Sequence, residues 1–153
     1  MNTGYRVQDV MRSNVLTATP ETPIIECARQ MADKEVGSLV LLNSEGKIQG
    51  ILTEQDLSRK VVAKGIDPKQ TAAARVMARS VITISPEKDI YDAIVLMGKN
   101  RIKHLPVKKE NRIAGIISFK DIIRIEPALI EILSFKSSIS QEESMSVFGK
   151  FKK

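Results

Sequence analysis

Two aspartates occupy matching places in the chain, each three residues after a hydroxyl side chain. Asp56 follows Thr53 and Asp121 follows Ser118, and a glycine with two apolar residues precedes each pair. This order is typical of a short buried strand that leads into a helix, with the hydroxyl at the N-cap and the acid in the first turn. A carboxylate there can accept both cis hydroxyls of a ribose, and the helix start offers N–H groups to phosphate oxygens. The spacing is therefore compatible with a nucleotide site.

The same spacing also has a purely structural interpretation. Serine or threonine followed three residues later by an acid forms a capping box, which is common at helix starts. In that case Asp56 and Asp121 would only cap helices. The recurrence of the phrase within a longer repeat favours a functional role beside the structural one.

The residues around the two phrases repeat along the chain. With an offset of 66, identical residues fall on each other at Val10 and Val76, Met11 and Met77, Val15 and Val81, Thr17 and Thr83, Pro20 and Pro86, Ile24 and Ile90, Met31 and Met97, and Leu39 and Leu105. One residue is then lost from a loop, and Gly50 and Asp56 match Gly115 and Asp121 at an offset of 65. A tandem duplication explains this pattern, and repeats constrain the fold before any other feature.

Each repeat predicts the same order of elements, a strand, a helix, two strands and a closing helix. The predicted strands are 15–18, 36–42 and 48–52 in the first repeat, and 81–84, 104–108 and 112–117 in the second. The predicted helices are 24–31 and 54–64, then 90–97 and 119–125, and residues 69–75 favour a short helical connection. The fold class is therefore α/β, in the α+β arrangement.

This element order, the leading Val-Met pair and the Gly-apolar-apolar-Thr/Ser-x-x-Asp signature resemble the cystathionine β-synthase (CBS) domain. Two such units in tandem are similar to a CBS pair, or Bateman module. The resemblance implies two β-α-β-β-α units, residues 7–66 and 67–126, packed about a pseudo-twofold axis, with residues 67–75 as the linker. Residues 127–153 form a C-terminal tail outside the resemblance, which we expect to be partly helical.

The resemblance also implies two ligand sites in the cleft between the units. Each would combine the aspartate and hydroxyl of one unit, near ribose and phosphate, with the first strand of the other unit, around adenine. The first site would join Thr53 and Asp56 to Ile82 and Thr83, and the second would join Ser118 and Asp121 to Leu16 and Thr17.

The two repeats differ where phosphates would lie. Lys103 and His104 belong to a basic stretch of the second repeat, which the first repeat replaces with Glu-Val-Gly-Ser, and Lys120 has a glutamine as its counterpart. We expect these three side chains to clamp an anion in the Asp56 site, so that the two sites are unequally occupied. Alternatively, the lysines are ordinary solvated side chains and His104 packs at the start of a strand.

Composition is typical of a globular protein, and we expect a cytoplasmic location. It is 42% hydrophobic and carries a net charge of +6, with no apolar run long enough to cross a membrane and no apolar signal-peptide core. Its one cysteine, Cys27, lies on an apolar helix face and is expected to be an inert core thiol. Aromatic residues make up only 4%, which weighs against a base-stacking surface for single-stranded nucleic acid.

The sequence lacks the motifs of common catalysts. One histidine and no Cys-x-x-Cys leave no metal constellation, and neither a phosphate-binding glycine loop nor a nucleophile elbow is present. We therefore expect a regulatory binder rather than an enzyme, with no obligatory cofactor. As a CBS pair it would bind AMP, ADP, ATP or S-adenosylmethionine and modulate an unknown partner protein, and the resemblance implies a homodimer. Two alternatives remain open, a nucleic-acid-binding adaptor driven by the positive charge, and a structural dimerisation module without a ligand.

Overall fold

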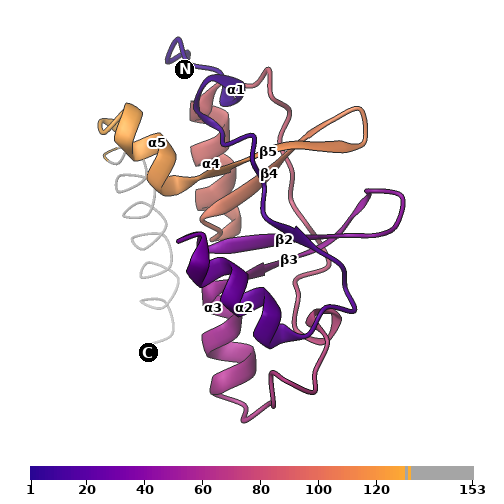
Figure 1. The fold of residues 1–153 in the computed structure, drawn as a ribbon. Coiled ribbons are helices and arrows are strands. Elements are labelled where there is room, and N and C mark those ends of the chain that lie inside the picture. The colour runs from indigo at the N-terminus through magenta and orange to yellow at the C-terminus, as the bar shows by residue number, and fades with distance from the viewer. Residues whose placement is uncertain (130, 132–153) are drawn as a thin grey trace, which may run out of the picture.

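The computed structural model describes residues 1–129 and 131, which form two halves of similar construction (Figure 1). The predictions for the tail beyond residue 131 lie outside the described residues. The first half contains β1 (Thr17–Ala18), α2 (Ile24–Asp33), β2 (Ser38–Leu42), β3 (Ile48–Thr53) and α3 (Glu54–Asp56), which continues as a π-helix, η1 (Leu57–Val62). The second half contains α4 (Ile90–Asn100), β4 (His104–Lys109), β5 (Arg112–Ser118) and α5 (Phe119–Ile125). None of the described helices is long and apolar enough to cross a membrane.

The two small sheets follow the repeat but are not identical. In the first half β1 pairs in parallel with β2, which pairs antiparallel with β3. In the second half β4 pairs antiparallel with β5, and the strand predicted at 81–84 is reduced to one bridge between Ile84 and Val107.

A proline explains the missing strand. In the first half the backbone N–H of Val40 donates to the carbonyl of Leu16, 3.0 Å away, which holds the start of the parallel pairing. Pro106 stands at the matching place of the second half and has no N–H to donate to Ile82. The segment before Ile84 therefore runs alongside β4 without joining its ladder.

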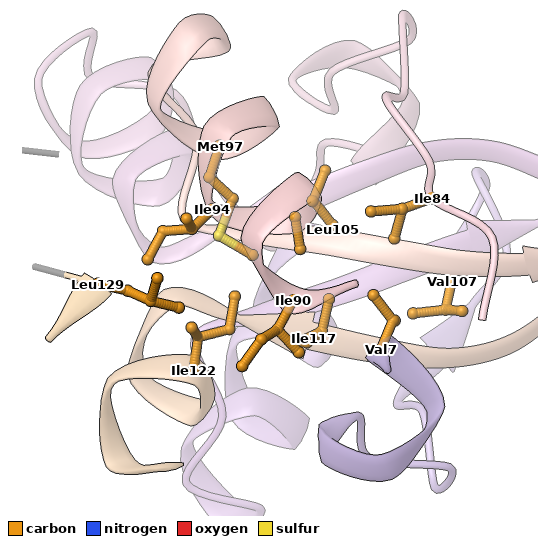
Figure 2. Close-up of a cluster of buried hydrophobic side chains, with 11 residues drawn as sticks. Val7, Ile84, Ile90, Ile94, Met97, Leu105, Val107, Ile117, Ile122 and Leu129 are labelled. Carbon is orange, nitrogen blue, oxygen red and sulfur yellow. The ribbon is translucent and has the colours of Figure 1, made fainter. Parts of the chain in front are cut away.

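Each half buries its own apolar core. Ile24, Leu39 and Leu52 are among the buried residues of the first core, and Ile90, Leu105 and Ile117 are among those of the second (Figure 2). Residues that match in the repeat, such as Ile24 with Ile90 and Leu39 with Leu105, therefore occupy the cores of both halves.

The segments at the start of the two repeats are exchanged between the halves. The short helix α1 (Val7–Val10) lies beside α4 and β5 of the second half (Figure 1), and Val7 is fully buried in the second core (Figure 2). The matching 3₁₀ helix, η2 (Ala73–Arg75), begins the second repeat but packs its buried Ala73 into the first core. Because each half completes the core of the other, neither is a self-contained unit.

The glycine of each repeated phrase accommodates this exchange. A Cβ atom on Gly50 would lie 2.5 Å from the sulfur of Met77, and one on Gly115 would lie 2.5 Å from the sulfur of Met11. The methionine of each Val-Met pair therefore packs against the phrase glycine of the other repeat.

Candidate functional site

Both predicted capping boxes form. Oδ2 of Asp56 accepts the N–H of Thr53 at 3.0 Å and its hydroxyl at 3.1 Å, while the Thr53 oxygen accepts the N–H of Asp56 at 3.2 Å. Ser118 and Asp121 repeat this arrangement, with the hydroxyl 2.5 Å from Oδ2. Both aspartates therefore act as helix-capping residues, and both also line cavities.

The first cavity, of about 470 Å³, lies where the two halves meet. The first half contributes Thr53 and Asp56, and the second contributes Ile82, Lys103 and His104. The rest of the lining includes apolar residues, Ile51, Ala78, Val81, Ile102 and Pro106, and two more cations, Arg59 and Arg101. The cavity therefore combines an acid, an apolar surface and positive charge. Thr83 is half-buried and does not line it.

The second cavity, of about 540 Å³, contains the matching Ser118 and Asp121. The predicted Leu16 lines a separate hollow of about 30 Å³, which also reaches Ser118. Thr17 is exposed in β1 and lines neither space.

Lys120 corrects one prediction about the clamp. It lines the second cavity and not the first, because it lies in the first turn of α5, beside Asp121. Lys103 and His104 line both cavities. All three side chains predicted to clamp an anion therefore line the second cavity, and only Lys103 and His104 also line the first.

The two aspartates are paired with cations that come from different directions. Lys60 lies 2.8 Å from Oδ1 of Asp56 and also donates to the carbonyl of Val76 at 3.1 Å, and it does not line the first cavity. Arg12 lies 3.3 Å from Oδ2 of Asp121 and does line the second cavity. Arg12 was not identified from the sequence, although the 66-residue offset aligns it with Ala78.

His104 stands in the wall between the cavities, beside Gly37 and Glu54, which also line both. A Cβ atom on Gly37 would lie 3.1 Å from Nε2 of His104 and 3.3 Å from a carboxylate oxygen of Glu54, so only glycine leaves this wall undisturbed. Burial lowers the pKa of His104 below its usual 6.5, and the neighbouring Glu54 carboxylate only partly opposes this shift. His104 is therefore mainly neutral at pH 7.

Cys27 lies away from both cavities, in the first core. Burial raises the pKa of its thiol to about 11, and the nearby Glu26 carboxylate adds to the shift. A thiol in this state is a poor nucleophile and a poor metal ligand. Among the residues that the structure describes, no group of three or more His, Cys, Asp or Glu side chains is arranged to hold a metal ion.

Comparison with known proteins identifies one family for both halves of the chain. The CBS domain model matches residues 7–63 and again 73–127. An uncharacterised protein of Methanopyrus kandleri is 33% identical over 138 residues, which span 90% of this chain and 70% of that protein. A 17.7 kDa protein of Acidianus ambivalens is 28% identical, across 90% of this chain and 81% of that one.

Solved structures agree with the fold. An uncharacterised conserved protein from Pyrococcus horikoshii superimposes with a TM-score of 0.76 at 29% identity, over 82% of this chain and 94% of that one. The CBS domain pair of protein MJ0100, crystallised with 5′-methylthioadenosine and S-adenosyl-L-methionine, gives a TM-score of 0.74 at 26% identity, over 81% and 97% of the two chains. With its duplicated phrase, exchanged leading segments and paired sheets, this chain belongs to the CBS domain family as a tandem CBS pair.

Proposed function

We propose that this CBS pair is a regulatory sensor that binds an adenosyl ligand in the first cavity. One observation carries the proposal, which is that an acid from one half and an apolar wall with cations from the other half line a single cavity of about 470 Å³. The ligands crystallised with the MJ0100 pair support an adenosyl compound as the ligand class.

The cavity offers a partner for each part of such a ligand. The carboxylate of Asp56, held by Thr53, faces the space where two ribose hydroxyls would donate to it. The apolar side chains of Ile82 and Pro106 would contact the base. Phosphate or carboxylate groups would lie toward Arg101 and Lys103, whose charges attract anions.

The second cavity also contains cations, Arg12, Lys120 and Arg124 among them, but it differs from the first at the repeat position of Arg101. Arg101 and Glu35 are matched by the repeat, and both adopt a left-handed backbone, with φ of 55° and 52°. Arg101 lines the first cavity and Glu35 lines the second, so the charge at this place is reversed. We therefore retain unequal occupancy, with the Asp56 site preferred, although Lys120 takes no part in that site.

The regulatory step follows from the position of the cavity. A ligand that contacts both halves favours the relative arrangement in which both sets of contacts are made. In this proposal the change is transmitted to a partner protein, and the pair acts as a homodimer in the cytoplasm.

A ligand panel tests the proposal. We expect AMP, ADP, ATP or S-adenosylmethionine to raise the melting temperature of the full chain by mass action. Asp56→Asn should keep a capping side chain but weaken binding by about tenfold or more, because a hydrogen bond to a charged group is worth about 1.5–3 kcal/mol. Calorimetric titration of both proteins measures this difference.

Asp121→Asn is the matched control, because it makes the same chemical change in the second cavity. Its affinity for the first ligand molecule should stay close to that of the wild type. No response to any adenosyl compound would contradict the proposal and leave the two aspartates as helix caps. A steep loss of RNA or DNA binding with added salt would instead favour a nucleic-acid adaptor.

A further inference from the structure

Arg12 and Ala78 occupy the same place in the two repeats. The N–H and carbonyl of Arg12 both pair with Ile116 at 2.9 Å. Those of Ala78 pair with Ile51 at 2.9 and 3.0 Å. Because the backbones are held alike, the two side chains start from equivalent points, one as a methyl group and the other as a guanidinium.

The two side chains have opposite effects on their cavities. Ala78 contributes only a methyl group to the wall of the first cavity. Arg12 extends into the second, where its guanidinium lies 3.3 Å from Oδ2 of Asp121. Arg12 contacts Oδ2, the oxygen that also accepts the hydrogen bonds from Ser118, and both partners of this ion pair line the second cavity. The side chains of Asp121 and Asp56 are almost equally exposed, at 13% and 14%. In the first cavity the cation on Asp56 is Lys60, which does not line the cavity.

The second site is also divided where the first is continuous. Ile82 and Asp56 line one cavity of about 470 Å³. Their counterparts are separated, since Leu16 lines the hollow of about 30 Å³ and Asp121 lines the cavity of about 540 Å³. Residues that line both of these spaces form the partition, and they include Arg12, His104 and Ser118.

We propose that Arg12 closes the second site to adenosyl ligands, and that the Arg12/Ala78 difference sets the number of ligands bound per chain. This inference rests on the proposed binding of an adenosyl ligand in the first cavity. In this proposal a base occupies the Leu16 hollow and a ribose contacts Asp121, and the Arg12 side chain lines both spaces. Removing it joins the two spaces and frees the carboxylate.

Exchanging the two side chains tests the inference. Calorimetric titration of the full chain, with AMP and with S-adenosylmethionine as separate probes, should give one equivalent for the wild type. Arg12→Ala should add a second equivalent, with at least about a tenfold gain in affinity at that site, the gain expected when a hydrogen bond to a charged group becomes available. Ala78→Arg should abolish the first equivalent.

The double variant Arg12→Ala/Ala78→Arg should again bind one equivalent, and this binding should be lost on adding Asp121→Asn but not Asp56→Asn. Arg79→Ala is the charge-matched control, because Arg79 is exposed, lines none of these cavities and donates to the carbonyl of Ala74. It should behave as the wild type.

Three results would overturn the inference. The first is a wild type with two equal sites. The second is an Arg12→Ala protein that still binds one equivalent, as Arg79→Ala does. The third is weaker binding by Arg12→Ala, which would make Arg12 a ligand contact. The first two leave the proposed function intact. A wild type that binds neither probe, nor ADP or ATP, overturns the proposed function itself. Because Ala78→Arg gives an independent measurement, the test does not depend on the folding of one variant.

Discussion

At the scale of single residues, Asp56 and Asp121 show how identical side chains acquire different surroundings. Each closes a capping box with a neighbour three residues before it, and this local geometry follows directly from the sequence. The cations that approach them, Lys60 and Arg12, come from one turn later in the helix and from 109 residues away. The local pair could be predicted from spacing, whereas the distant one depends on how the halves pack.

His104 likewise has one property that the sequence predicted and one that depends on how the halves pack. Its place in a basic stretch of the second repeat predicted contact with a ligand, but no pattern indicated that it would stand between two cavities. Its pKa is lowered by burial, with contributions of both signs from Glu54, Arg12, Asp121 and Lys103. Burial dominates these charges, so the neutral imidazole is favoured in the folded protein.

This shift predicts a pH dependence of stability. Below pH 6.5 the unfolded chain binds a proton at His104 more readily than the folded chain does, so the free energy of unfolding should fall as the pH falls. We expect the melting temperature of the wild type to drop more between pH 7.5 and 5.5 than that of His104→Gln. Because His104 is the single histidine, the comparison isolates its titration. Equal drops in the two proteins would contradict this assignment.

At the scale of elements, the sequence predicted β5 and α5 to within one residue, because Ser118 marks the end of the strand and the start of the helix. The strand expected at 81–84 failed because its partner, Pro106, cannot donate the hydrogen bond that Val40 donates in the first half. The helix expected at 54–64 continues as a π-helix through Val62, a local geometry that hydrophobic periodicity does not distinguish.

The phrase glycines carry a second element-scale prediction. Alanine at residue 115 would place its Cβ 2.9 Å from the carbonyl oxygen of Arg12, which cannot move without breaking the pairing with Ile116. We expect Gly115→Ala to lower the free energy of unfolding by about 1–3 kcal/mol, the range typical of overpacking. Urea denaturation measures the loss.

Gly50→Ala is the matched comparison, since its nearest backbone atom, the carbonyl oxygen of Ala78, is 3.1 Å away. It should cost less than Gly115→Ala. In both variants the flexible methionine can turn aside, so the difference reports the carbonyl contact. A greater loss in Gly50→Ala would show that the carbonyl contact does not decide the cost.

At the scale of the whole molecule, the exchanged segments make the two halves interdependent. The repeat was evident from the sequence, and the CBS resemblance supplied the pairing of halves. The exchange itself was not predicted, because each Val-Met pair was assigned to the repeat that contains it in the sequence. The limits 7–66 and 67–126 describe the sequence repeat and remain a prediction for the domains. They cut across the cores, which take Val7 into the second and Ala73 into the first.

A buried side chain of the exchanged segment tests this interdependence. Val7→Ala removes two methyl groups from a fully buried site, so we expect the free energy of unfolding to fall by about 1–3 kcal/mol. Thermal unfolding should remain a single transition, because loss of one core removes contacts from the other. Val62→Ala is the control, since Val62 is 78% exposed and should change stability by about 0.5 kcal/mol at most. Two separate transitions would contradict the interdependence.

The exchange also bears on how such a chain can arise. A chain with one repeat would carry both a leading Val-Met segment and a phrase glycine, and two identical chains could exchange those segments as the two halves do here. Gene duplication and fusion would turn that concentration-dependent assembly into a permanent intramolecular one. After fusion the two repeats no longer need to be identical, so residues 12 and 78 can differ from each other within one chain.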